Sequence, residues 1–405
     1  MISGIAGIYY YLENYEKAEQ YNQVAITKAL ELLGSQSMSY CHALNTKGVL
    51  QITKGRYQEA IENFQASYNI LVQHDVNQAD KATSLANIAD IYRRRGDYQE
   101  SIDFLFQANE YYKHSEKHQI DVIANLLTIA QNYLTSKKYD QAISFSQRVI
   151  RLIESSEKHQ LSPVSLAHAH LSIAESYRMQ GEFKKCSVNL DQIKNIEGKI
   201  NLDTQSEVQQ EYGALFLAQK NYPKALEAFQ QSLAINTQQY AKYQHHPKRA
   251  EDHQNIAECY LAEGKTTKAI AQYQKALQAL ALGFVDHDPQ KNPAIENMLS
   301  LKVGFPILQG KARALFQQFQ NQDKTIYLQY SLDTYQALGN LIDKARTGFT
   351  SEDSKLFLLA NAQSVFEEGI QTALALYEQN QETRFLEKAF HFAESNKAIL
   401  MQESL

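Results

Sequence analysis

The chain has 405 residues, of which 44% are apolar, enough to bury a sizeable core. Forty basic and 45 acidic residues are well mixed and give a formal charge of −5, which argues against a nucleic-acid or anionic-membrane partner. The sequence contains no run of about 18 apolar residues, so no transmembrane helix is predicted. The N-terminal stretch lacks a basic region, so we expect no signal peptide and a cytoplasmic location.

The cysteines and the helix breakers are both sparse. Cys41, Cys186 and Cys259 lie far apart and form no CxxC pair, which predicts buried, reduced thiols. Only six prolines and sixteen glycines interrupt the chain, and this favours long helices.

Residues 85–108 show the pattern that organises the chain. Leu85, Ile88 and Tyr92 recur at helical spacing, an Arg-Gly-Asp turn follows, and a second apolar helical face begins after it. Ala89 and Ser101 are small enough for two helices to pack closely. This order of small and large apolar residues resembles the tetratricopeptide repeat (TPR).

The same pattern occurs seven times along the chain. The small residue that opens each second helix is, in order, Ala18, Ala60, Ser101, Ala142, Cys186, Ala225 and Ala269. The intervals are 42, 41, 41, 44, 39 and 44 residues, longer than the TPR period of about 34 residues. We therefore predict an all-α TPR solenoid, a right-handed superhelix of about nine helical hairpins.

A change of composition divides the chain. Residues 283–293 concentrate Gly, Pro and Asp, which is typical of a loop that ends a repeat array. We expect a TPR array at 1–282, this loop at 283–293, and a TPR-like helical extension at 294–405. In the extension, Pro306 is predicted to start a helix that runs to about residue 319, and Asp323 to cap a helix through about residue 346. Thr350 with Asp353 is predicted to open a helix to about residue 377, and a last helix begins near Thr383.

The C-terminal segment carries a second resemblance. Its pattern AFxxxExxKAxL comprises Ala389, Phe390, Glu394, Lys397, Ala398 and Leu400, and Arg346, Ser354 and Lys355 match upstream. It is similar to the segment that joins the TPR array to the caspase-like peptidase in bacterial TPR–CHAT proteins. In that family a Cys/His peptidase domain follows this segment and holds the catalytic residues. None of Cys41, Cys186 and Cys259 corresponds to them, so the resemblance implies no catalytic residue within these 405 residues. The first helix begins without a polar cap and the last has nothing to cover it, so we expect a fragment of a longer protein.

The first helices of a TPR array usually line its concave binding surface. The positions between the packing residues are Asn87, Asp90, Arg93, Arg94, Gln131, Leu134, Ser172, Glu175, Arg178, Asn255 and Glu258. Asn87 and Asn255 share one position in the repeat, where an amide can both donate to and accept from a peptide backbone. The alternative is that these residues are merely solvated.

Other candidate sites have plainer explanations. The Arg93–Arg95 run could clamp an acidic group, but cations also stabilise the C-terminus of a helix. His168 with His170, His245 with His246 and His253, and the Asp286–Asp288 segment lack zinc-type spacing, so we expect no metal and no cofactor. The sequence contains none of the nucleotide-binding, nucleophile-elbow or zinc-protease motifs, so we expect no enzyme within it.

These features lead to three hypotheses of function. The first is a protein- or peptide-binding scaffold that acts as the recognition and regulatory region of a CHAT caspase-like protease, with the peptidase domain as its partner in the same polypeptide. The second is a free-standing TPR adaptor or peptide sensor. The third is the sensor arm of a signalling kinase or transcription regulator.

Overall fold

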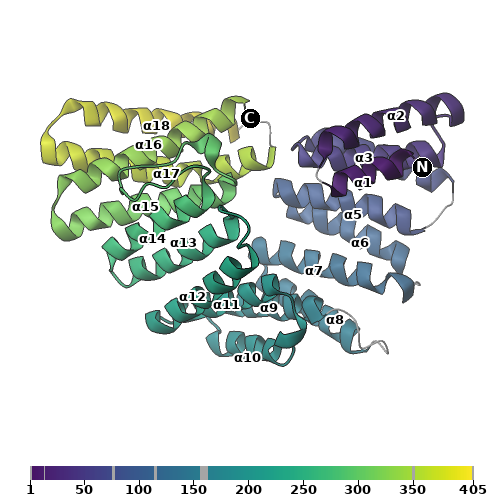
Figure 1. Ribbon diagram of the computed structural model, residues 1–405, viewed down its shortest axis with the longest axis horizontal. Coiled ribbons are helices and arrows are strands. Elements are labelled where there is room, and N and C mark those ends of the chain that lie inside the picture. Colours follow the sequence, from purple (N-terminus) through teal and green to yellow (C-terminus); the bar gives the residue numbers. More distant parts are fainter. Residues whose placement is uncertain are drawn as a thin grey trace. The chain divides into compact units, whose positions relative to one another are not determined.

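The computed structural model describes residues 2–12, 14–74, 78–113, 116–155, 163–348 and 352–403. These residues form eighteen α-helices, with only an isolated bridge between Ala281 and Met298 in place of a sheet (Figure 1). Two compact units are distinguished: Met1–Glu182 with Thr350–Asp353, and Phe183–Phe349 with Ser354–Leu405. None of the described helices has the length and apolar character that a membrane span requires.

The first unit contains successive antiparallel helices (Figure 1). They are α1 (Ile2–Tyr11), α2 (Tyr15–Leu33), α3 (Met38–Thr53), α4 (Tyr57–Gln73), α5 (Gln78–Arg95), α6 (Tyr98–Tyr112), α7 (Gln119–Thr135), α8 (Tyr139–Glu154) and α9 (Pro163–Met179), with the 3₁₀ turn η1 (Glu116–His118).

The second unit continues the helical pattern and ends in longer helices. They are α10 (Phe183–Lys194), α11 (Leu202–Ala218), α12 (Tyr222–Gln239), α13 (Pro247–Ala262), α14 (Thr266–Leu280), α15 (Leu301–Gln322), α16 (Thr325–Gly348), α17 (Glu352–Asn380) and α18 (Thr383–Glu403), with the 3₁₀ turns η2 (Glu197–Lys199) and η3 (Ile295–Asn297). The all-α solenoid predicted from the repeats is confirmed.

Small side chains set the helix packing in each hairpin. The seven residues predicted to open the second helices, from Ala18 to Ala269, are all completely buried. Where the first helix has glycine at this level, an aromatic ring occupies the space: a Cβ on Gly213 would lie 2.4 Å from the Phe229 ring, and one on Gly48 would lie 2.7 Å from Phe64. The sequence pattern therefore identified buried small residues of the hairpins correctly.

The turn inside the hairpins requires a left-handed backbone. Gly55, Gly96, Gly181 and Gly264 supply it, with φ between 69° and 89°. In the fourth and sixth repeats, which lack this glycine, Lys137 and Lys220 adopt φ of 60° and 59°. An L-residue with a Cβ pays a steric cost there that glycine avoids.

Two helix boundaries differ from the sequence prediction. Helix α15 begins at Leu301, so Pro306 lies inside the helix instead of at its start, and Ser300 provides the N-cap. Asp323 has φ 53° and ψ 34° and ends α15, whereas we expected it to cap the next helix. Aspartate has a short polar side chain that suits the N-cap of a helix, and it also tolerates the left-handed backbone at a helix C-terminus. The sequence alone therefore could not tell whether Asp323 ends α15 or begins α16. The predicted Thr350 cap lies outside the described residues.

The connection between α14 and α15 is held by four polar side chains that we call the loop anchor: the buried Gln274 and Lys311 and the half-buried Gln278 and Asn292. The Lys311 amino group is fully buried and donates to Gln274 Oε1 at 2.8 Å, the Lys291 carbonyl at 2.7 Å and Asn292 Oδ1 at 2.9 Å. The Gln274 amide donates to the carbonyls of Asp286 and Asp288. The segment that the composition marked as a loop is therefore an ordered part of the second unit.

Candidate recognition faces

The candidate groove residues of the first unit lie on α5, α7 and α9. On α5, Asp90 Oδ1 lies 2.5 Å from Arg93 Nη2 and Asp90 Oδ2 lies 2.7 Å from Arg94 Nε. Burial alone would raise the pKa of Asp90, but the hydrogen bonds from Arg94 and Arg93 lower it overall. Two guanidinium groups on one carboxylate leave this end of α5 with an excess of positive charge, while Asn87 is half-buried one turn earlier.

The same repeat position has a different environment on α7 and α9. Gln131 is exposed. Glu175 forms a longer ion pair, 3.7 Å from Oε1 to Arg178 Nη2, and burial raises its pKa because Arg178 opposes only part of that effect. Asp90 of the third repeat and Glu175 of the fifth occupy equivalent positions, and their pKa values are therefore shifted in opposite directions.

Two of the predicted groove positions are wrong. Leu134 on α7 and Ser172 on α9 are buried, with only 5% and 7% of their surfaces exposed. Each lies on the packed side of its helix. The packed face of these helices is wider than the four positions of the repeat pattern from which the groove residues were inferred.

In the second unit, Asn255 and Glu258 lie half-buried on α13. The Tyr273 hydroxyl donates to Glu258 Oε1 at 2.6 Å, and burial together with the Glu258 charge raises the Tyr273 pKa. The tyrosine therefore remains a hydrogen-bond donor over the ordinary pH range. Gly310 on α15 makes room for the ring, since a Cβ there would lie 2.5 Å from the Tyr273 oxygen.

A further polar network in this unit was not predicted from the sequence. Glu368 on α17 accepts from Arg313 Nε at 3.0 Å and Nη2 at 2.5 Å, from the Tyr335 hydroxyl at 2.9 Å and from the Gln309 amide at 3.1 Å. The Arg313 side chain is nevertheless half-exposed. Glu368 lies 55 residues from Arg313 in the sequence, so the pairing of these two residues could not be predicted. The sequence shows only that Gln309 and Arg313, at i and i+4, lie on one face of a helix.

The histidines noted in the sequence have structural partners. His245 Nδ1 lies 2.8 Å from the Gln278 carbonyl, His253 Nδ1 lies 2.9 Å from Gln272 Oε1, and His246 stacks on Tyr240. Among the described residues no group of three or more His, Cys, Asp and Glu is placed to hold a metal. All three cysteines are buried thiols that form no disulfide, as predicted.

The repeat pattern and its geometry agree with a family model described as tetratricopeptide repeat, which matches residues 1–73, 54–114, 80–155 and 202–281. These matches span more than half of the chain. The chain belongs to the TPR family. None of the curated proteins matches this sequence.

Solved structures with similar folds include two Rap proteins and a bacterial TPR protein. The apo form of RapI has a TM-score of 0.55 at 10% identity and covers 100% of this chain and 97% of its own. A Rap protein complexed with Competence and Sporulation Factor has a TM-score of 0.53 at 13% identity and covers 99% and 98%. A TPR protein from Parabacteroides merdae has a TM-score of 0.47 at 15% identity over 78% and 98% of the two chains. At these identities the likeness to the two Rap structures shows the fold alone.

Proposed function

We propose that this TPR chain is the recognition and regulatory region of a CHAT caspase-like protease. In this proposal a cytoplasmic protein or peptide binds the faces of the first helices, and the C-terminal helices carry the signal to a peptidase domain in the same polypeptide. The chain itself supplies no catalysis. The proposed division is an array at 1–282, the loop at 283–293 and the extension at 294–405.

The observation that carries this proposal is how α18 uses its AFxxxExxKAxL residues. Ala389 is buried against the core of the second unit, but Phe390 is 68% exposed. Glu394 and Lys397 are also exposed and, with Phe390, follow one face of the helix. Packing within the second unit accounts for Ala389 and leaves Phe390, Glu394 and Lys397 for another surface to contact.

Site-specific crosslinking tests this surface. A photoreactive phenylalanine analogue at position 390 of the native polypeptide, expressed in its source cell, is expected to crosslink within the same chain to a region with a Cys/His peptidase pair. The same analogue at Phe106, a partly exposed residue of α6, is the matched control. A native polypeptide of about 46 kDa that gives no such crosslink at position 390 would contradict the proposal.

The recognition face is tested separately. Asn87→Ala with Arg94→Ala is expected to reduce capture of a partner crosslinked in the source cell by tenfold or more, because an amide and a charge-assisted donor are lost. Lys117→Ala, at an exposed position outside the first-helix faces, is the control. Unchanged capture by the double variant would place binding elsewhere.

A free-standing peptide sensor is the second candidate. The likeness to two Rap proteins over nearly the whole of both chains favours it, since one of them is complexed with Competence and Sporulation Factor. A native mass near 46 kDa with retained partner capture would support this candidate over the protease-linked one.

A further inference from the structure

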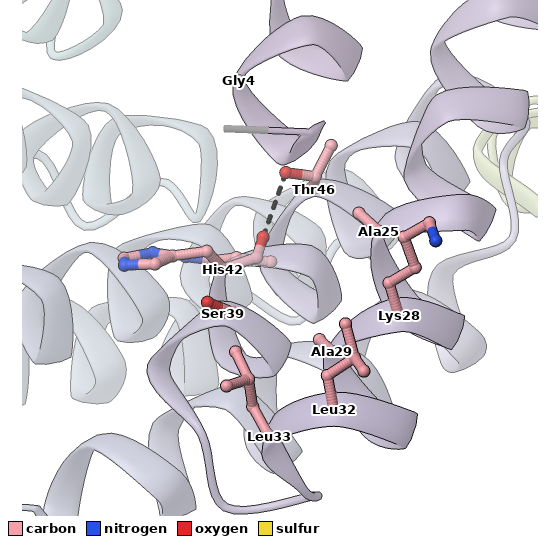
Figure 2. Close-up of a pocket in the computed structure, with 10 residues that line it drawn as sticks. Gly4, Ala25, Lys28, Ala29, Leu32, Leu33, Ser39, His42 and Thr46 are labelled. Atoms are coloured by element: carbon pink, nitrogen blue, oxygen red, sulfur yellow. Dashed lines mark hydrogen bonds between the residues drawn. The ribbon is translucent and has the colours of Figure 1, made fainter.

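A hollow of about 600 Å³ lies between α2 and α3 of the first unit, beside Gly4 of α1 (Figure 2). This volume falls within the range of roughly 300–1,000 Å³ that small-molecule sites occupy. The hollow is separate from Asn87, Asp90 and the other proposed recognition residues, none of which lines it.

Helix α2 provides an apolar wall. Ala25 and Ala29 are buried and form its inner part, whereas Leu32 and Leu33 are 74% and 61% exposed. Two adjacent leucines this exposed at the edge of a concave surface leave apolar area in water that a ligand could cover. The wall therefore suits an aliphatic group.

The opposite wall and the rim are polar and basic. Ser39, His42, Asn45 and Thr46 line the hollow from α3, and the Thr46 hydroxyl donates to the His42 carbonyl at 3.0 Å (Figure 2). Lys28 lies on α2 between Ala25 and Ala29. Among the described residues that line the hollow, the ionisable groups are Lys28 and His42, and none is a carboxylate. The charge of the site is therefore complementary to an anion.

We propose that this hollow binds an aliphatic carboxylate. The aliphatic part packs on Ala25, Ala29, Leu32 and Leu33, and the carboxylate pairs with Lys28. Two sources share this chemistry: the C-terminal residue of a peptide that ends in leucine or a similar residue, and a free fatty acid. The proposal concerns a second site and does not depend on the proposed function.

Isothermal titration of the 405-residue chain with four probes tests the chemistry. The probes are octanoate, octanol, N-acetyl-Ala-Leu and N-acetyl-Ala-Leu amide. At least one carboxylate is expected to bind saturably, and at least fivefold more tightly than the alcohol or amide of the same shape. Octanoate binding alone would identify a fatty acid as the source, and N-acetyl-Ala-Leu binding alone a peptide C-terminus.

Two variants locate the binding in this hollow. Leu33→Glu places a negative charge on the apolar wall and is expected to weaken carboxylate binding at least tenfold, and Lys28→Gln at least threefold. Leu30→Glu, on the same helix but outside the hollow, and Lys184→Gln on α10 are the matched controls and are expected to bind as the wild type does. All four changes are at exposed positions, and circular dichroism checks that each variant folds.

Three results would overturn the proposal. They are no saturable binding of either carboxylate, equal binding of the neutral probes, and carboxylate binding that folded Leu33→Glu and Lys28→Gln both leave unchanged.

Discussion

The regular hairpins of the first unit and the last helices of the second are stabilised in different ways. In α3–α9 the buried apolar residues form several separate clusters: one joins Tyr57 and Phe64 of α4 with Ile88 of α5, and another runs from Ala89 on α5 to Ala169 on α9. In α13–α18 one continuous core joins helices far apart in the sequence, from Tyr273 through Tyr335 and Phe366 to Phe392. The loop anchor around Lys311 belongs to this second region.

This difference has a consequence for cooperativity. Where each helix contacts only its neighbours, stability is close to a sum of local terms, and a local change stays local. Where one core joins six helices, a change at its centre affects the whole region. Substitutions of matched size are therefore expected to have larger and longer-range effects in α13–α18 than in α3–α9.

The largest effect is expected at the loop anchor. Lys311→Met removes the donor to the buried Gln274 Oε1 and the half-buried Asn292 Oδ1 and leaves the Lys291 carbonyl with only the longer bond from the Gln274 amide, at a cost of about 3 kcal/mol in the free energy of unfolding. Urea unfolding measures this cost, and hydrogen exchange should show faster exchange across residues 283–293. Lys324→Met, at an exposed position of the same unit, is the control. An unchanged unfolding midpoint would show that the anchor contributes nothing to stability.

The loop anchor also predicts a pH dependence. Burial lowers the pKa of the Lys311 amino group to about 7, with the charges of Asp288 and Asp286 opposing the shift. Since the pKa is depressed on folding, the contribution of Lys311 is largest above the unfolded pKa of about 10.4 and decreases as the pH falls towards 7. Unfolding free energies measured at pH 7 and pH 9 should show that the wild type becomes more stable relative to Lys311→Met at the higher pH. A gain in the opposite direction would contradict the depressed pKa.

A smaller effect is expected where glycine faces an aromatic ring. Gly213→Ala would place a Cβ 2.4 Å from the Phe229 ring, and the displacement should cost about 2 kcal/mol. Gly198→Ala, with no heavy atom within 4 Å of the added Cβ, is the matched control. Thermal unfolding of both variants measures the difference, and equal melting temperatures would mean that the hairpin relaxes without cost.

The left-handed turns should respond in opposite directions. Lys137→Gly relieves a Cβ at φ 60° and is expected to stabilise the first unit by about 0.5–1 kcal/mol, whereas Gly96→Ala at φ 89° should destabilise it by about 1 kcal/mol. Chemical denaturation of the two variants beside the wild type tests the pair. The same sign of change for both would show that the turn backbone does not limit stability.

The smallest effects are expected at the carboxylates of two candidate groove residues, Asp90 and Glu175. The pKa of Glu175 is raised on folding, so its contribution is present below its unfolded pKa and is lost as the pH rises through the folded value. The pKa of Asp90 is lowered, so its contribution is present above its unfolded pKa and is lost as the pH falls through the folded value. Both side chains are partly exposed, so each effect should remain below about 1 kcal/mol. A carboxyl-carbon NMR titration should show Glu175 protonating at higher pH than Asp90, and the reverse order would contradict the assigned environments.

The sequence by itself determined the repeat, the small residues at the helix crossings and the glycine turns, because these depend on spacings within one hairpin. It also located Asp90, Glu175 and Glu258 at equivalent repeat positions, but not their different partners. Only the tertiary structure decided that Arg313 is held by Glu368, that Lys311 orders the 283–293 segment, that Leu134 is buried and that a hollow forms beside Leu32 and Leu33. Each of these depends on contacts with neighbouring helices, and a helical period carries information about one helix face but not about which side chains of another helix meet it.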